Sequence, residues 1–583
     1  MGNLRPVLII GLVFLGYMLW VEWQKDYGPQ SSPAAAEATS STDTLSIPSP
    51  DSVDAADMPQ PDESRAVASQ PPPQGDGTAQ DLPPVGTPTD LATETASNEM
   101  KGASPFVTVT TDVLDIKIDL TGGTVISASL LNYPVLLKDP DSKVNLFSSQ
   151  GDHMFIAQSG LLSQQSAPNH TSQFQSARLD YQLATGAEEI RVPLTWESQD
   201  GVRVTKTFIF KRDQYDIEVR FQLSNNSGVT WTGSRYDQLQ QSVPGDEDLG
   251  GFTNPGRYSF HGIGFYSPED KFEKVSFDDV ADEPFEKTFS GGWLAMIQHY
   301  FFTAWIPPEN EQASYSTKEL KSSGWPRYIA RDVSPQQQVA PGGRGEFSSR
   351  LYVGPKLQDR LPEVAPGLEH TVNYGIFTVF SKPLFWLLEK IHNVVGNWGW
   401  AIVLLTILVK AAFFKLTEAQ YKSMARMRKL QPRIDQLKER YGDDRQRMSQ
   451  AMMEMYKQEK VNPLGGCLPI LVQIPVFIAL YWVLLESVEL RQAPFILWIH
   501  NLSDRDPYFV LPLLNAAFMF ATQRLTPAAG MDPMQRKMMN MMPLVFSVMF
   551  AFFPAGLVLY WATNAGLSLA QQYYITRKIA AAD

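Results

Sequence analysis

The sequence predicts a multi-span α-helical membrane protein of about six transmembrane helices, with a cytoplasmic helical hairpin and a large antiparallel β-sandwich domain outside the cytoplasm. Three observations predict this fold class. An apolar run lies near the N-terminus, the middle of the chain alternates apolar and polar residues with a period of two, and from Trp398 onward apolar runs alternate with short charged stretches. The mean hydropathy of −0.18 averages over these parts and conceals the difference between them.

Residues 1–25 are predicted to form an N-terminal transmembrane anchor. The apolar run of residues 6–21 follows Arg5, and Trp20 and Trp23 stand where an interfacial aromatic belt is expected. A cleaved signal peptide is the alternative, but the small residues 34–36 are too distant from the apolar run for normal cleavage. Because Arg5 favours the inner side, we expect the N-terminus in the cytoplasm.

Residues 26–105 are predicted to form a disordered acidic linker. This stretch is rich in Pro, Ser and Ala, has very few aromatic residues, and carries most of the formal net charge of −13. Such a composition buries too little apolar surface to offset the entropy lost on ordering.

Residues 106–370 are predicted to form the β-sandwich. Apolar and polar residues alternate in residues 106–120 and 202–221, and Gly-rich pairs such as Gly122-Gly123 mark turns. Trp231, Trp293 and Trp305 are interpreted as core residues, and a carbohydrate or peptide groove is the alternative.

The remaining chain is predicted to be helical. Residues 371–397 place apolar residues on one side and charged residues on the other, which is typical of an amphipathic helix in the membrane interface. Residues 398–578 are predicted to form a core of five transmembrane helices. Their expected ranges are 398–416, 468–487, 508–522, 538–553 and 556–575.

Residues 417–461 are predicted to form the cytoplasmic hairpin, with helices at 418–440 and 443–460 separated by Tyr441-Gly442. The Lys and Arg residues of this stretch agree with a cytoplasmic location. Its apolar residues are interpreted as the hairpin's own seam, and a docking surface for varied apolar partners is the alternative. These residues are Met424, Met427, Leu430, Ile434 and Leu437 on one helix and Met448, Met452 and Met455 on the other.

Lys410 is the most informative single residue, because a charge near the centre of a spanning helix costs about 2.5 to 3.5 kcal/mol on insertion scales. Its side chain could extend to the inner headgroups beside Lys415. It could instead project into a hydrated cavity in the bundle, on the same helix face as Thr406. Gln473 is a second polar residue at membrane depth, and its simplest interpretation is an interhelical hydrogen bond.

The sequence offers little support for catalysis. The only cysteine is Cys467, the seven histidines are scattered, and the common catalytic and nucleotide-binding motifs are missing from the sequence. We therefore expect a protein that is not an enzyme and that has no metal or cofactor.

Four motifs resemble the YidC-type membrane protein insertases, which are related to the mitochondrial Oxa and chloroplast Albino proteins. The motifs are residues 460–468 (KVNPLGGCL), 489–500 (ELRQAPFILWIH), 532–535 (DPMQ) and 554–564 (PAGLVLYWATN). The resemblance is strong over residues 371–578. The anchor and the β-sandwich resemble the Gram-negative version, which implies an inner-membrane, multi-pass protein with a periplasmic domain.

The resemblance also implies a hydrophilic, positively charged groove that is open to the cytoplasm and to lipid. Lys410 aligns with the cationic position, where many relatives have Arg, so the charge is preserved. Thr406, Gln473 and Trp561 align with groove-lining positions, the last of which is more usually Tyr. Ile474, Pro475 and Phe477 align with an apolar side along which a substrate helix would slide.

The implied function is the insertion and folding of integral membrane proteins, alone or with the Sec translocon. The implied partners are nascent membrane proteins, the Sec translocon and membrane lipids, together with the ribosome and a targeting receptor at the hairpin. The short stretch after Lys578 places tail-mediated ribosome binding in doubt. A lipid or solute transporter is the alternative function, although the inverted repeats common in transporters are not evident. A membrane-anchored carbohydrate-binding protein would not need the hairpin.

Overall fold

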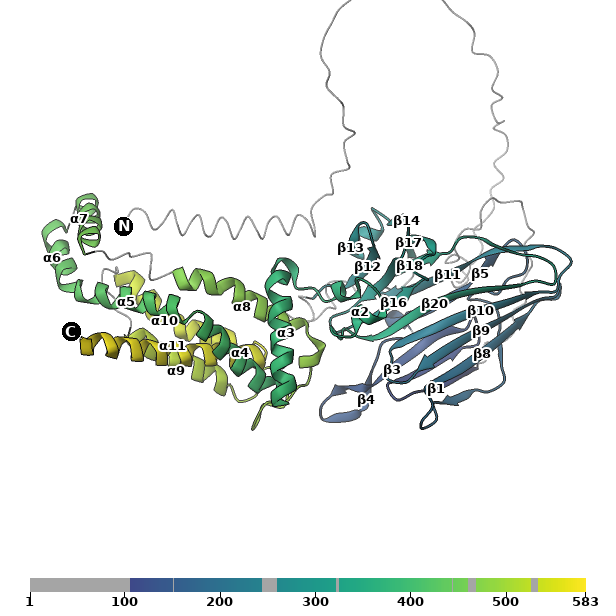
Figure 1. Cartoon of the computed structure of the whole chain (residues 1–583), viewed down its shortest axis with the longest axis horizontal. Coiled ribbons are helices and arrows are strands. Elements are labelled where there is room, and N and C mark those ends of the chain that lie inside the picture. The colour runs from purple at the N-terminus through teal and green to yellow at the C-terminus, as the bar shows by residue number, and fades with distance from the viewer. Residues whose placement is uncertain are drawn as a thin grey trace, which may run out of the picture. The chain divides into compact units, whose positions relative to one another are not determined.

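The computed structural model describes residues 105–149, 151–243, 259–320, 325–442, 444–459, 468–525 and 533–582 (Figure 1). The predicted anchor at 1–25 and the linker, apart from Pro105, lie outside the described residues. So do most of the motif at 460–468, including Cys467, and Asp532 of the motif at 532–535. The described residues begin with β-strands and continue, from Leu361, with helices.

Among the described residues, the larger of two β-sheets contains eleven strands. In spatial order, the main path is β14 (Glu286–Ser290), β17 (Gln312–Leu320), β18 (Arg327–Val333), β11 (Trp231–Ser242), β5 (Phe155–Ser163), β3 (Thr124–Leu136), β2 (Leu114–Asp119), β1 (Phe106–Thr110) and β7 (Asp180–Gln182). Two further strands are β19 (Gln337–Val339), which pairs with β11, and β4 (Asp139–Asn145), which pairs with β3.

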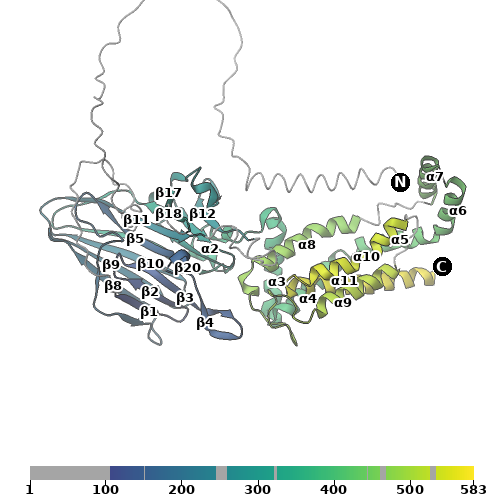
Figure 2. The same cartoon turned by 180° about the vertical axis from the view of Figure 1, so that it is seen from behind.

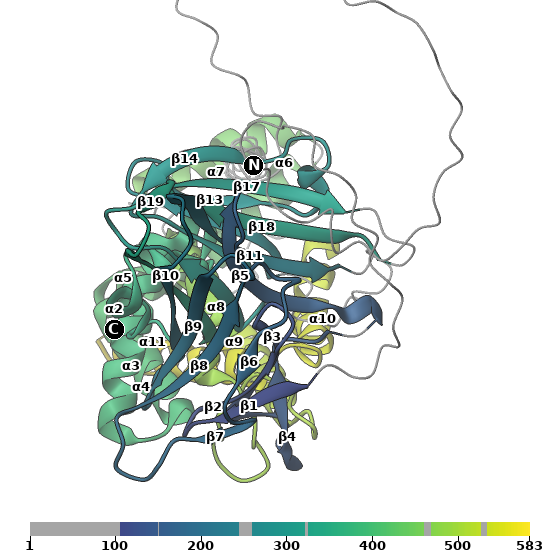
Figure 3. The same ribbon diagram turned by 90° about the vertical axis from the view of Figure 1, so that its right-hand side faces the viewer.

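The second sheet contains nine strands, several of which run side by side in Figure 3. Their spatial order is β13 (Lys271–Val275), β12 (Gly262–Ser267), β15 (Trp293–Ile297), β16 (Phe301–Ile306), β20 (Arg344–Pro355), β10 (Asp216–Asn225), β9 (Val202–Lys211), β8 (Glu189–Glu197) and β6 (Gln175–Ser176). All its pairs are antiparallel within the described residues.

The predicted antiparallel β-domain is confirmed, with one exception. Strand β7 pairs in parallel with β1, where Thr108 lies opposite Asp180. Strand β7 has only three residues, so alternation along the sequence gives no indication of its partner.

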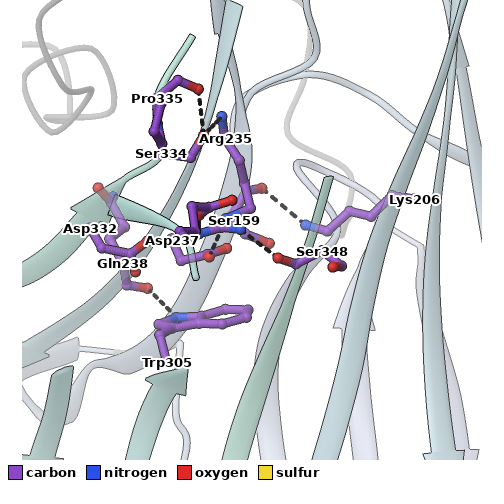
Figure 4. A network of polar contacts seen from close by, with 11 residues as sticks. Ser159, Lys206, Arg235, Asp237, Gln238, Trp305, Asp332, Ser334, Pro335 and Ser348 are labelled. Carbon is purple, nitrogen blue, oxygen red and sulfur yellow. Dashed lines mark hydrogen bonds and ion pairs between the residues drawn. The ribbon is translucent and has the colours of Figure 1, made fainter. Parts of the chain in front are cut away.

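The inner faces of the two sheets share one apolar core, and the interpretation of the three tryptophans as core residues is confirmed. Trp231, Trp293 and Trp305 are 0%, 1% and 1% exposed. Each indole N–H also finds an acceptor, as a buried Trp requires. Trp305 Nε1, on the second sheet, donates to the carbonyl oxygen of Gln238 on the first at 3.1 Å (Figure 4).

A charged network that the sequence did not predict is buried in the same core (Figure 4). Lys206 Nζ donates to the carbonyl oxygens of Gly122, Gly123 and Ser159 at 2.9, 2.9 and 3.0 Å. Arg235 pairs with three carboxylates, at 2.7 Å from Asp237, 3.0 Å from Asp332 and 2.8 Å from Glu311. These contacts compensate for the removal of the two cations from water.

The helical part follows the strands directly. Its α-helices are α2 (Leu361–Val364), α3 (Thr378–Val395), α4 (Trp398–Ala412), α5 (Phe414–Lys429), α6 (Gln431–Tyr441), α7 (Arg445–Gln458), α8 (Leu468–Glu486), α9 (Val510–Leu525), α10 (Pro533–Phe550) and α11 (Ala555–Ala582). Between α3 and α4 the chain turns sharply, since Gly396 is left-handed with φ of 68° and the side chain of Asn397 accepts a hydrogen bond from the Trp400 N–H.

Two predicted helices differ from the structure. The expected helix at 418–440 is wrong as a single element, because it is split at Leu430 into α5 and α6. Pro432 lies in the first turn of α6, where its ring would clash with a continuous preceding turn. The expected span at 398–416 is also interrupted, with a bend of 62° between α4 and the first part of α5.

Length and composition identify few candidate membrane spans among the described residues. No single described helix is long and apolar enough to qualify, whereas the bent pair Trp398–Ala412 and Phe414–Ser423 does so jointly.

Candidate functional site

Lys410 lies on α4, and its side chain turns toward α11. The residue is 9% exposed, and its Nζ donates a hydrogen bond to Ser568 Oγ at 2.8 Å. The outward face of α4 carries instead Leu404, Ile407 and Leu408, which are exposed. A lysine that extends toward the headgroups would keep its ammonium group in water. The geometry therefore favours the alternative in which Lys410 faces the interior of the bundle.

Ser568 of α11, the partner of Lys410, is not among the residues that the sequence predicted for the site. Besides accepting from Lys410, its hydroxyl donates to the Asn564 carbonyl oxygen at 2.7 Å. Its own carbonyl oxygen accepts from the Tyr421 hydroxyl of α5 at 3.3 Å. The available signal was the spacing of Asn564, Ser568 and Gln572, because polar residues four apart share one face of a helix.

Gln473 on α8 reaches the same face of α11. Its Nε2 donates to Asn564 Oδ1 at 3.2 Å, so the interpretation as an interhelical hydrogen bond is confirmed. Asn564 and Ser568 lie one helical turn apart. Lys410 of α4 and Gln473 of α8 thus both contact α11, on two successive turns. We call Lys410, Gln473, Asn564 and Ser568 the polar strip.

The Thr406 side chain makes its hydrogen bond within α4, and not to α11. It is 1% exposed, and its Oγ1 donates to the Ile402 carbonyl oxygen of its own helix at 2.7 Å. The hydroxyl proton is therefore used within α4, and only the oxygen lone pairs remain as acceptors.

Trp561 lies one turn before Asn564 on α11 and joins the polar strip to an apolar side. Its ring packs edge-on against Phe477 of α8, with centroids 4.6 Å apart. Its buried Nε1 has no hydrogen-bond partner among the described residues. Ile474 and Pro475 precede Phe477 on α8, and all three are partly exposed.

The electrostatic character of the site comes from Lys410. Within the part of the chain that the structure describes, no carboxylate forms an ion pair with this ammonium group. Its described partner is a neutral hydroxyl. The site can therefore attract a negative or strongly polar group.

Comparison with known proteins places both parts of the chain in one family. The family model described as the YidC periplasmic domain matches residues 106–387. A second model, described as the 60Kd inner membrane protein, matches residues 390–582.

Two relatives match this chain over almost its whole length. The "Membrane protein insertase YidC" of Thioalkalivibrio sulfidiphilus is 47% identical over 593 residues, which cover 99% of each chain. The protein of the same name from Nitrosococcus oceani is 47% identical over 582 residues, again with 99% of both chains covered. A solved structure described as an active YidC insertase with its first transmembrane domain resolved matches 81% of this chain and 93% of its own, with 20% identity and a TM-score of 0.38.

Members of this family are inner-membrane proteins with a periplasmic domain, and they are insertases of no known enzyme class. The chain belongs to the YidC family of membrane protein insertases.

Proposed function

We propose that this protein inserts and helps to fold integral membrane proteins by receiving their polar segments at Lys410. One observation carries the proposal. Lys410 is a buried cation whose described hydrogen-bond partner, Ser568 Oγ, is uncharged. The positive charge is therefore not neutralised within the described part of the protein and remains available to an incoming chain.

The energetics are non-covalent. A polar segment that enters an apolar layer loses its hydration, and this cost opposes crossing. Contact with Lys410 and the amide groups of Gln473 and Asn564 would offset part of it. No nucleotide or covalent intermediate is required, because the apolar part of the substrate gains transfer free energy when it reaches lipid.

The apolar side of the site has a complementary role in this proposal. Ile474, Pro475 and Phe477 would contact the apolar helix of the substrate while Lys410, Gln473 and Thr406 hold its polar segment. Trp561, which packs against Phe477, would mark the boundary between the two surfaces.

We also propose a topology for the chain, with six transmembrane helices and with the N-terminus and the hairpin in the cytoplasm. The proposed domain limits are 1–25, 26–105, 106–370, 371–397 and 398–578. Nascent membrane proteins are the proposed substrates. We further propose contacts with the Sec translocon and lipids, and contacts of the hairpin with the ribosome and a targeting receptor.

Reconstitution tests the function directly. The purified chain in liposomes is given a single-span substrate with a short acidic tail, and translocation of the tail is measured by protection from external protease. We expect protected tail well above that in empty liposomes. Protection equal to that in empty liposomes would overturn the proposal.

Substitution of Lys410 tests the site. We expect Lys410→Ala to reduce insertion by about tenfold, which corresponds to ~1.4 kcal/mol of lost interaction, and Lys410→Arg to preserve most of it. Lys415→Ala is the matched control, because Lys415 is an exposed lysine just beyond α4. Full activity of Lys410→Ala in the liposome assay and in insertase-depleted cells would remove Lys410 from the mechanism.

A further inference from the structure

The hairpin formed by β3 and β4 ends in three consecutive exposed apolar residues. Val135, Leu136 and Leu137 are 45%, 62% and 45% exposed. The hairpin projects beyond the neighbouring strands of its sheet (Figures 1 and 2). Its pairing shifts register twice, at Pro134 and before Leu136, so the tip departs from a regular ladder. A contiguous apolar tip of this kind indicates a contact surface.

The base of this tip is fixed to the segment that follows α8. Arg491 Nη2 donates to the Pro134 carbonyl oxygen at 2.9 Å. Gln492 Nε2 donates to the carbonyl oxygens of Pro134 and Val135, both at 3.1 Å. The Arg491 guanidinium also lies over the Phe301 ring, which packs edge-on against Tyr133 of the hairpin.

The C-terminal end of α8 marks the periplasmic side of the bundle. The Leu485 carbonyl oxygen accepts a hydrogen bond from His299 Nε2 at 2.9 Å, and Glu486 Oε2 accepts from Ser259 Oγ at 3.2 Å. His299 and Ser259 belong to the stretch that matches the periplasmic domain of the family. In an inner-membrane protein, the residues just after α8 therefore lie at the outer surface of the bilayer, and the hairpin tip is held at that level.

The same segment exposes a second pair of apolar side chains. Ile496 and Leu497, a few residues after Gln492, are 42% and 73% exposed. Leu497 has φ of 55°, a conformation that leucine rarely adopts. Two exposed apolar elements thus flank the Arg491–Gln492 attachment.

We propose that the β3–β4 hairpin is a membrane-docking element whose Val135, Leu136 and Leu137 enter the interfacial layer of the outer phospholipid leaflet. The charged residues that follow balance, since Lys138 and Lys143 are accompanied by Asp139 and Asp141. Docking therefore depends on burial of the apolar tip and needs no anionic lipid. The proposal depends on the inner-membrane location of the family and is independent of the insertion activity.

Spin labelling of the full chain in nanodiscs of phosphatidylcholine tests the proposal. In a Cys467→Ser background, a nitroxide is placed at Leu136→Cys and, as a control, at Val229→Cys. Val229 is matched in exposure, at 58%, and lies in the connection between β10 and β11. The measured quantity is the ratio of collision rates with oxygen, which concentrates in lipid, and with a water-soluble nickel chelate.

We expect a ratio several-fold higher at Leu136 than at Val229, and no change when half of the lipid is anionic. Leu136→Asp, with the label moved to Leu137→Cys, should lower the ratio to the value at Val229. Equal ratios at Leu136 and Val229 would overturn the proposal. Protection of Leu136 in native inner membranes but not in nanodiscs would also overturn it, because a protein would then cover the tip.

Discussion

At the scale of single residues, the buried network around Arg235 places three carboxyl groups, of Asp237, Glu311 and Asp332, around one guanidinium group. Asp332 is fully buried, its Oδ2 accepts from Arg235, and its Oδ1 has no hydrogen-bond partner among the described residues. Burial, followed by the charge of Asp237, raises the pKa of Asp332 well above its usual range, although Arg235 opposes the shift. Burial also raises the pKa of Asp237, but Asp237 lies closer to the guanidinium group, at 2.7 Å from Arg235 Nε against 3.0 Å for Asp332. We therefore expect Asp332 to bind a proton more readily than Asp237.

This assignment predicts unequal effects for two similar substitutions. Asp332→Asn should lower the free energy of unfolding by about 1 kcal/mol or less at pH 7, because Asn resembles the protonated acid. Asp237→Asn should cost about 3 to 5 kcal/mol, since it leaves Arg235 with less compensation. The measurement is urea unfolding of the full chain, followed by hydrogen exchange of β11 and β18.

The raised pKa of Asp332 also predicts how the free energy of unfolding changes with pH. A carboxyl group whose pKa is raised by folding stabilises the protein fully below its unfolded pKa of about 4, and this contribution is lost as the pH rises through the folded value. Asp332→Asn should therefore remove a decline in stability toward alkaline pH. Equal costs for the two variants at pH 7 would show that Asp332 carries a charge.

The sequence was informative about single residues only where their type was unusual for their surroundings. Lys410 and Gln473 stood out because polar groups are costly in an apolar run. Their partners Ser568 and Asn564 did not, since a serine or asparagine in a helix of mixed composition has no such contrast. Lys206 and Arg235 were also not predicted as buried, although alternation places Lys206 on the same strand face as Val204 and Phe208. The pattern does not show which groups from other strands would compensate a buried charge.

At the scale of elements, α6 and α7 form a hairpin whose predicted seam is confirmed for five of the predicted residues, Leu430, Ile434, Leu437, Met452 and Met455. Leu430, Ile434, Met452 and Met455 form a buried cluster. Leu437 and Tyr456 pack against it. The spacing of the apolar residues predicts the helices and their seam. It does not predict the break before α6, for which Pro432 is the signal in the sequence.

The seam predicts a contrast between two neighbouring methionines. Met452 is 4% exposed and Met453 is 43% exposed. Met452→Ala should cost roughly 2 to 5 kcal/mol, and a hairpin with so small a core should then open locally. Hydrogen exchange should become faster throughout α6 and α7 in this variant and remain unchanged in Met453→Ala. Similar exchange in both variants would indicate that the hairpin is held together by other contacts.

At the scale of the whole chain, the described β-strands and helices are connected by hydrogen bonds as well as by sequence. His299 of the β-domain donates to the carbonyl oxygen of Leu485 on α8 at 2.9 Å. Two separate hydrophobic patterns predicted the two parts, but no periodicity predicts contacts between them. Such contacts depend on single side chains at the ends of elements, which sequence patterns do not specify.

This connection predicts a sensitivity to acid. Burial, with the nearby charges of Lys356 and Arg491, lowers the pKa of His299 to about 3, while the hydrogen bond to Leu485 opposes the shift. A depressed pKa gives a contribution to stability that is present above the unfolded value of about 6.5 and is lost as the pH falls toward the folded value. Between pH 7 and pH 5, the loss should be at most about 2 kcal/mol, because the ring remains partly exposed.

His299→Gln is the matched variant, since its amide N–H can still donate to Leu485 but does not titrate in this range. The thermal unfolding midpoint of the full chain in nanodiscs should fall between pH 7 and pH 5, and fall less in the variant. Burial raises the pKa of Glu489 to about 7, so this group changes stability in the opposite direction. It is present in both chains, and their difference therefore isolates His299. Identical shifts in the two chains would mean that His299 does not carry the acid sensitivity of this contact.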